Sequence, residues 1–225
     1  MQETNLLKKS NAILPDPYAD SVVLDLSAYS GSVVDAKGHT LANTNVVASA
    51  TQKKWGPYSM WFNANAWLQI GNNANSDFWL QADFCIETWI YLVARTTQYP
   101  CYFNNYNVWP NANALGLFAG HQQRPTDYTT ALTGTFPAAE STQALIFGAW
   151  SHLATVRSGS TITTYINGAF ASSCSSSAAL YGTKTYITIG NSADTMSNGM
   201  LNAYVERYRI TNVARYTAPF TPQRF

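Results

Sequence analysis

The chain has 225 residues, of which 46% are hydrophobic and 11% are charged. The charged share is less than half of the roughly 25% that is usual in soluble domains, and Asn, Ser, Thr, Gln and Tyr supply most of the polarity. Thirteen basic and twelve acidic residues leave a formal net charge of +1, which gives no electrostatic footprint for nucleic acid or an anionic membrane. The length suits one large all-β domain or two small ones, and we expect no nucleic-acid partner.

Residues 1–17 are predicted to form an N-terminal arm, because they are polar, contain Pro15 and Pro17, and show no helical periodicity. Lys8 and Lys9 are not followed by an apolar run of about seven residues, so no secretory signal peptide is expected. No later segment approaches the length of an apolar membrane-spanning helix, so we expect no membrane insertion. The product is therefore expected to stay soluble where it is made.

From Tyr18 onward, short β-branched or aromatic runs alternate with Gly, Asn, Asp and Ser turns, and no helical pattern persists beyond two turns. This pattern predicts an all-β body. The expected strands are 21–27, 59–63, 66–71, 84–93, 114–120, 143–148, 150–159, 161–168, 185–191 and 202–211. Ten strands predict two packed sheets, and the Ser-rich stretch 171–179 is predicted to be a surface connection.

The strand 84–93 is expected to be covered on both faces. Its alternate residues suit the inner face of a sheet, and the residues between them are too apolar for open water. The inner set is Phe84, Ile86, Thr88, Ile90 and Leu92, and the other set is Cys85, Glu87, Trp89 and Tyr91.

The segment 150–168 predicts a β-hairpin that turns at Ser158-Gly159-Ser160 and leads to an Asn167-Gly168 turn suited to positive φ. His152 is interpreted as a structural residue of its first strand.

Three cysteines, Cys85, Cys101 and Cys174, form an odd set without metal-ligand spacing. Cys85 and Cys101 lie in strand-like apolar segments, where cysteine commonly behaves as a small hydrophobic residue. Reduced thiols are therefore expected, with a Cys85–Cys101 disulfide as the alternative.

Two motifs, in this order, resemble the laminin-G-like branch of the concanavalin A-like lectin and glucanase superfamily. A strand ending in Phe and a polar turn precede a D-F-x-I-E-x-W element, and a W-x-H-x-A-x-x-R hairpin follows. The resemblance implies a jelly-roll sandwich of two antiparallel curved sheets over 18–211, with a C-terminal tail at 212–225. The matching positions are Asp83, Phe84, Ile86, Glu87, Trp89, Trp150, His152, Ala154, Arg157, Tyr165, Asn167 and Gly168.

The lead-in at 16–62 and the closing segment 202–225 are similar to those of bacteriophage tail and fibre proteins of this family. The resemblance implies a virion protein made in the host cytoplasm, with other virion proteins as partners and a homo-oligomer or symmetric assembly. The chain departs from the family at Glu206-Arg207, where the last strand usually carries an Asp-Glu pair. That departure puts any role of an acidic pair there in doubt.

Enzymes also occur on this fold, so catalysis is judged from the residues. Retaining glycosidases need two carboxylates about 5 Å apart, and Asp83 and Glu87 have suitable parity on one strand. Cys85 and Trp89 share their face, however, and no interleaved Glu-Asp-Glu or G-x-S-x-G motif is present. A non-enzymatic protein is predicted.

Calcium is the one cofactor that the resemblance suggests, because many laminin-G-like domains bind it. Asp127, Asn191 and Asp194 are the candidate oxygen donors. Calcium usually needs more carboxylates than these loops carry, so we interpret the three as turn residues and expect no cofactor.

The stretch 99–113 is built almost entirely of aromatic rings and carboxamides. Rings stack on the C–H faces of sugars, and amides donate and accept hydrogen bonds, so the stretch predicts a glycan-binding face. The same residue types also favour strands and turns, and a well-formed strand is the alternative. The candidate residues are Tyr99, Tyr102, Asn104, Tyr106, Trp109, Asn111, His121 and Tyr128.

The leading hypothesis is a non-enzymatic tail or capsid-surface protein that binds host glycans or neighbouring virion proteins. The alternatives are a purely structural virion module and a glycan-degrading enzyme on the same fold. Tyr216, Phe220 and Phe225 lie among prolines that prevent ladder pairing. Arm and tail are therefore expected to dock on the body or on adjacent subunits.

Overall fold

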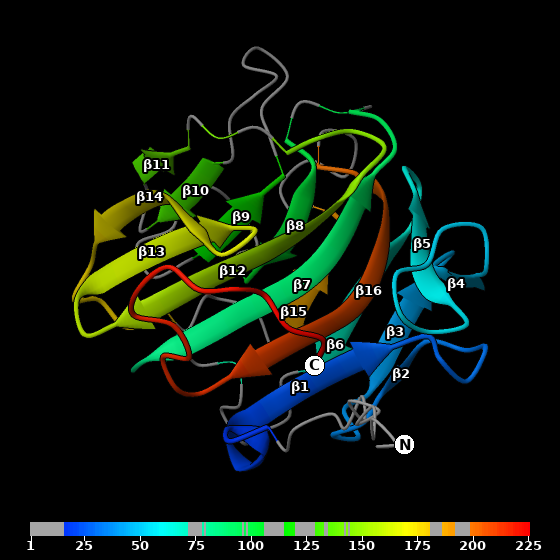
Figure 1. Ribbon diagram of the computed structural model, residues 1–225, viewed down its shortest axis with the longest axis horizontal. Helices are drawn as coiled ribbons and strands as arrows, with labels where there is room; N and C mark the ends of the chain where they lie inside the picture. The colour runs from blue at the N-terminus through cyan, green and yellow to red at the C-terminus, as the bar shows by residue number, and fades with distance from the viewer. Residues whose placement is uncertain are drawn as a thin grey trace, which may run out of the picture.

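In the computed structural model, the chain forms two β-sheets packed face to face (Figure 1). The structure describes residues 16–71, 78, 80–95, 97, 99–105, 115–119, 129–132, 135–141, 143, 145–180, 186–191 and 199–225, with the backbone alone for 129–132 and 135–138.

Within these residues, nine strands form the sheet that faces the viewer in Figure 1. Seven of them follow the order β14-β13-β12-β7-β16-β1-β2, while β5 pairs with β16 and β4 pairs with β5. Their bounds are β1 Val22–Ser27, β2 Val34–Asp35, β4 Val47–Ser49, β5 Ser59–Asn63, β7 Phe84–Leu92, β12 Trp150–Ser158, β13 Thr161–Ile166, β14 Ala169–Ser175 and β16 Asn202–Thr211.

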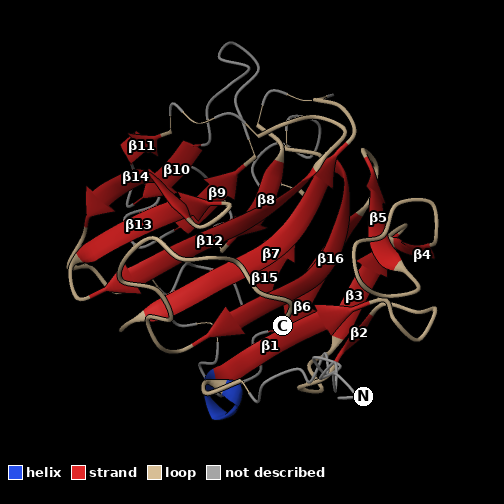
Figure 2. Cartoon of the chain, viewed as in Figure 1, coloured by secondary structure: helices blue, strands red, loops and turns tan. Residues whose placement is uncertain are grey.

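The second sheet has seven strands within the described residues, in the order β11-β10-β9-β8-β15-β6-β3. Besides strands and loops, the described chain has one short 3-10 helix, η1 Ala19–Ser21 (Figure 2). The predicted all-β sandwich of two antiparallel sheets is confirmed. The strands of the second sheet are β3 Leu41–Thr44, β6 Trp67–Gly71, β8 Cys101–Asn104, β9 Leu115–Phe118, β10 Thr129–Leu132, β11 Thr135–Glu140 and β15 Tyr186–Ile189.

The main core lies between the sheets, and β7 shows how the sequence builds it. Phe84, Ile86 and Ile90 are buried against the second sheet, as their alternation predicts. The opposite face of β7 is covered too, because Cys85 is buried in a separate cluster with residues of β12 and β13. The expectation that both faces of this strand are covered is confirmed.

A β-bulge in β16 decides which of its residues face outward. The bulge lies between Glu206 and Tyr208, and Arg207 there has φ of 55°. The extra residue shifts the alternation, so Tyr208 and Ile210 enter the core while Arg209 keeps the outer face that Glu206 occupies.

The hairpin at 150–168 is confirmed, with Asn167 at φ 52° and Gly168 at φ 77° in its second turn. Two other expectations were wrong. The segment 143–148 is no strand in its described residues, which lead to a turn at Gly148. The Ser-rich stretch is no mere connection, because the Asn167-Gly168 turn folds it back as β14 against β13.

The three cysteines are free thiols, as expected. Among the described residues, no helix is both long enough and apolar enough to span a membrane.

Candidate functional site

The predicted glycan-binding stretch lies largely outside the described residues, and its described part is mostly buried. Tyr99 is half-buried and packs edge-on against Phe118 with ring centroids 6.0 Å apart. Tyr102 is buried in the core, and its hydroxyl lies 3.3 Å from Thr155 Oγ1. Asn104 is buried and donates through Nδ2 to the carbonyl of Asn191 at 3.2 Å.

Tyr102 and Asn104 therefore do not contribute to an open face, because core packing and an internal hydrogen bond hold them. The other candidates lie outside the described residues, so the prediction for them stands as a prediction. They are Tyr106, Trp109, Asn111, His121 and Tyr128.

The calcium candidates are placed only in part. Asn191 is buried, whereas Asp127 and Asp194 lie outside the described residues. Within the part of the chain that the structure describes, no group of three His, Cys, Asp or Glu residues is placed to hold a metal ion.

Glu87, the carboxylate considered for catalysis, lies at the centre of a buried ionic network on the outer face of β7. Arg209 donates to Oε1 from Nη2 at 2.6 Å and from Nε at 2.9 Å. Tyr216 donates its hydroxyl to Oε2 at 2.8 Å, and Arg215 Nε lies 3.0 Å from Oε1. His152, fully buried, has its Nε2 3.3 Å from Oε2, and the structural role expected for it is confirmed.

The electrostatics of this network favour a permanently charged Glu87. Burial raises the pKa of the Glu87 carboxyl, but His152, Arg209 and Arg215 outweigh that effect and lower this pKa to about 2. Asp83, which the alternation along the strand predicted to share a face with Glu87, is half-buried and accepts a hydrogen bond from the Gly159 N–H at 2.8 Å. The two carboxylates thus have separate structural partners.

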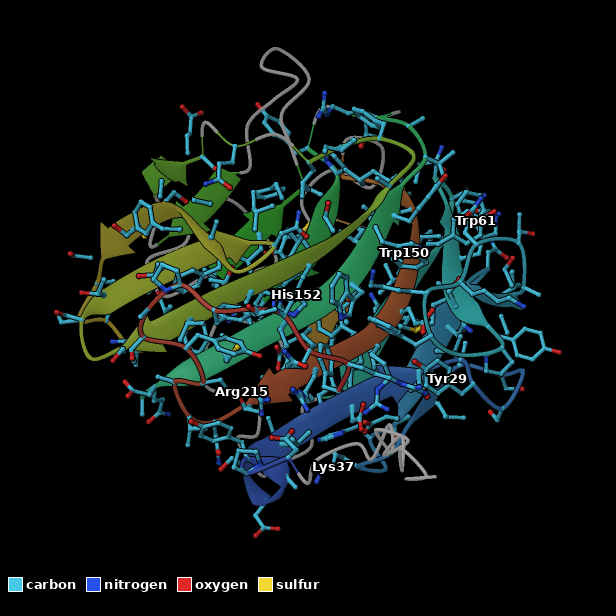
Figure 3. All side chains as sticks on the ribbon, in the orientation of Figure 1. Tyr29, Lys37, Trp61, Trp150, His152 and Arg215 are labelled. Atoms are coloured by element: carbon cyan, nitrogen blue, oxygen red, sulfur yellow. The ribbon has the colours of Figure 1, made fainter. Side chains whose placement is uncertain are left out.

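The C-terminal tail covers this network, as Figure 1 shows where the last segment crosses in front of β7 and β12. Tyr216 stacks on Phe220 with centroids 3.6 Å apart, and the Phe220 N–H donates to the Gly168 carbonyl at 3.0 Å. His152, labelled in Figure 3, meets Phe220 of the tail edge-on with ring centroids 5.7 Å apart, and Arg215 is itself part of the tail. The expectation that the tail docks on the body is confirmed.

Beyond the tail, the same outer face carries a row of four aromatic side chains. Tyr91 of β7 is paired in register with Trp150 of β12 and with Tyr204 of β16, and Tyr204 is paired with Trp61 of β5. All four are half-buried. We call Trp61, Tyr204, Tyr91 and Trp150 the aromatic row; Figure 3 labels its two ends, Trp61 and Trp150.

The rings of the aromatic row are in mutual contact. Trp61 and Tyr204 stack with centroids 4.2 Å apart, Tyr204 meets Tyr91 edge-on at 6.1 Å, and Tyr91 meets Trp150 edge-on at 5.7 Å. Neighbouring strands are about 4.8 Å apart, so the row crosses roughly 14 Å of sheet. It is an apolar ridge with indole N–H and phenol O–H groups, without an ionisable carboxylate of its own.

Three apolar side chains next to the half-buried row are exposed. Val47, which is paired with Trp61, is 51% exposed, and Ile146 and Phe147 next to the start of β12 are 62% and 41% exposed. Exposed apolar surface of this kind marks interaction sites in soluble proteins.

The loop 50–58 reaches β7 next to the row, where Trp55 meets Trp89 edge-on with ring centroids 6.0 Å apart. The buried carboxylate of Glu206 holds this loop, because it accepts hydrogen bonds from the backbone N–H groups of Lys54, Trp55 and Gly56 and from the Tyr29 hydroxyl. Lys54 Nζ lies 4.1 Å from the ring centroid of Trp89, which comes two residues before Tyr91 on β7.

The aromatic row was not predicted from the sequence. Trp61, Tyr91, Trp150 and Tyr204 stand in four strands that are far apart in the chain, and only the register between those strands aligns them. The one signal was the alternation of 84–93, which already placed Trp89 and Tyr91 on the outer face.

The family model described as the concanavalin A-like lectin/glucanases superfamily matches residues 62–218. The chain belongs to this superfamily. The resemblance seen in the sequence is thereby confirmed at the level of the superfamily. A search of curated protein sequences gave no significant match.

Solved structures of the same superfamily fold have low sequence identity to this chain. Domain 4 of an extracellular arabinanase from Geobacillus stearothermophilus, solved in complex with arabinotriose, is 15% identical with a TM-score of 0.65, over 86% of this chain and 93% of that domain. The binding domain of botulinum neurotoxin serotype C1 is 13% identical with a TM-score of 0.60, over 88% of this chain and 50% of that structure.

A further similar structure is of botulinum neurotoxin type C, whose cell entry depends on interaction with two ganglioside molecules. It is 16% identical with a TM-score of 0.56, over 88% of this chain and 49% of that structure. The chain thus spans about half the length of these neurotoxin structures. At such identities the likeness shows the shared fold alone.

Proposed function

We propose that this protein is a non-catalytic, lectin-like domain that binds glycan at the aromatic row. The observation that carries the proposal is the alignment of four half-buried aromatic residues on four adjacent strands, on one face of the sheet. Aromatic rings bury the C–H faces of sugars, and their N–H and O–H groups can bond hydroxyls at the same time.

The relatives support a glycan as the ligand class. One neighbour in fold was solved with arabinotriose, and another depends on gangliosides for cell entry. Because a fold hosts many functions, the location of the site rests on the residues of this chain.

Binding is tested on a glycan array with the protein displayed in many copies. One stacked ring contributes about 1 kcal/mol, so a single domain binds weakly and multivalent display is needed for detection. Tyr91→Ala and Trp150→Ala should each weaken binding about fivefold, which is the factor that about 1 kcal/mol gives.

Phe170→Ala is the matched control for these variants. Phe170 is an aromatic residue on β14 of the same sheet and is 52% exposed, but it lies outside the row. It should leave binding unchanged. A row variant that binds as the wild type does, at unchanged thermal stability, contradicts the proposal.

The non-catalytic part of the proposal is supported by the state of Glu87, whose two oxygens are engaged by Arg209 and by Tyr216 of the tail. A polysaccharide depolymerisation assay tests it. We expect no turnover; turnover by the wild type that is lost in Glu87→Gln, with the variant shown to be folded by circular dichroism, would instead support the glycan-degrading enzyme.

The virion setting is proposed on the sequence resemblance alone. In that setting the domain is a tail or capsid-surface component made in the host cytoplasm. The alternative is a purely structural module, and it is favoured by the exposed apolar side chains beside the row, which suit a packed protein neighbour. These are Val47, Ile146 and Phe147. Immunolabelling of purified particles tests the setting. Absence of the chain from particles contradicts both the attachment role and the purely structural one.

A further inference from the structure

Lys54 occupies an unusual position beside the aromatic row. Its Nζ lies 4.1 Å from the centroid of the Trp89 ring and 4.8 Å from that of Trp55, so two indoles hold the ammonium group in place. The side chain is half-buried, while Trp55 is 42% exposed. The charge is therefore fixed in position and still in reach of solvent.

The nearby Glu206 carboxylate attracts the Lys54 ammonium group, but the two form no ion pair within 4.0 Å. Glu206 accepts from three backbone N–H groups and from the Tyr29 hydroxyl, which engages both of its oxygens. Among the residues that the structure describes, none forms an ion pair with Lys54 Nζ within 4.0 Å. A positioned cation with three N–H donors thus remains for a ligand.

The distance between this cation and the row suits one bound molecule. Trp89 and Tyr91 point to the same outer face of β7 and are two residues apart, which is about 7 Å along a strand. A sugar ring on Tyr91 and Trp150 would place its substituents toward Lys54. The aromatic row has no carboxylate that would repel a negative substituent, and the Glu206 carboxylate near Lys54 is buried and accepts from four hydrogen-bond donors.

We propose that the aromatic row selects acidic glycans and that the Lys54 ammonium group binds their carboxylate or sulfate group. This inference rests on the proposed function. A lysine is a point charge, so the geometry fits either anionic group. The apolar rings bind the body of the sugar and Lys54 distinguishes acidic from neutral forms.

The test is an array of matched glycans that carry the same neutral backbone with no acidic group, with a sialic acid, with a uronic acid or with a sulfate ester. The acidic members should bind the wild-type protein at least tenfold more tightly than the neutral member. That preference should shrink in high salt, because salt screens a partly exposed ion pair.

Lys54→Met removes the charge and keeps a flexible side chain that packs well on aromatic rings. It should bind acidic and neutral members equally, at the level of the neutral member for the wild type. Lys53→Met is the matched control, because Lys53 is the exposed neighbouring lysine and its loss changes the net charge equally. It should retain the preference, and thermal denaturation should show both variants folded.

Each result has a separate meaning. Equal binding of acidic and neutral members by the wild type overturns this inference and leaves the proposed function standing, and so does an acidic preference that survives Lys54→Met. Binding of no glycan at all overturns the proposed function and this inference together. If the protein prefers only the sulfated members or only the carboxylated members, that preference identifies which anionic group Lys54 binds.

Discussion

At the scale of single residues, Glu87 shows how much of this fold depends on one buried charge. Its carboxylate is fully buried and is shared by Arg209, Arg215 and Tyr216. Loss of one partner from a buried ion pair leaves the others uncompensated. Glu87→Gln should therefore lower the free energy of unfolding at neutral pH by about 3 to 5 kcal/mol in a urea titration.

The same residue predicts the acid sensitivity of the protein. The pKa of Glu87 is lowered from 4.5 to about 2 on folding, so its stabilising effect is complete above pH 4.5 and is lost as the pH falls from 4.5 toward 2. Glu87→Gln should lose less stability than the wild type over this window.

Asp83→Asn is the control, because it keeps the oxygen that accepts from Gly159 and should change stability by about 1 kcal/mol or less. Identical pH profiles of the wild type and Glu87→Gln would show that the network does not stabilise the fold.

At the scale of elements, the C-terminal tail serves as a cover for the outer face of β7 and β12. A Cβ atom added to Gly168 would lie 1.8 Å from the Phe220 carbonyl oxygen, so the tail fits only against a glycine there. Gly168→Ala should therefore displace the tail. Gly159→Ala is the matched control, because that glycine also has positive φ, at 60°, but an added Cβ there meets nothing within 4 Å.

Displacement of the tail can be followed at Cys85. This thiol is buried beneath Tyr216 and Phe220, and burial, assisted by Glu87, raises its pKa well above the usual value. A thiol reagent should label Cys85 faster in Gly168→Ala than in Gly159→Ala, while Cys101 in the core stays protected. Equal labelling of Cys85 in both variants would mean that the tail does not shield this face.

At the scale of the whole molecule, the sequence predicts the layers better than it predicts the site. Alternation within one strand reports which face is apolar, which is why the two faces of 84–93 and the hairpin at 150–168 were predicted correctly. Apolar content alone misled at 143–148, where Ile146 and Phe147 are exposed beside the turn at Gly148.

The aromatic row lies beyond such local patterns. It exists because β5, β16, β7 and β12 are paired in one particular register, and because the bulge at Arg207 keeps Tyr204, Glu206 and Arg209 on one face. The composition of 99–113 drew attention to a different segment, where Tyr102 and Asn104 are core residues. Aromatic residues that are close together in the sequence, as in 99–113, can be core residues. Aromatic residues that are far apart in the sequence can be brought side by side by strand pairing, as in the aromatic row.

Glycan binding at the aromatic row can be seen directly in a crystal structure of the domain with the glycan that binds best on the array. We expect a sugar ring in contact with Tyr91 and Trp150, with any acidic group directed at Lys54. A sugar bound to the 99–128 segment instead, with the aromatic row unoccupied, would contradict this expectation.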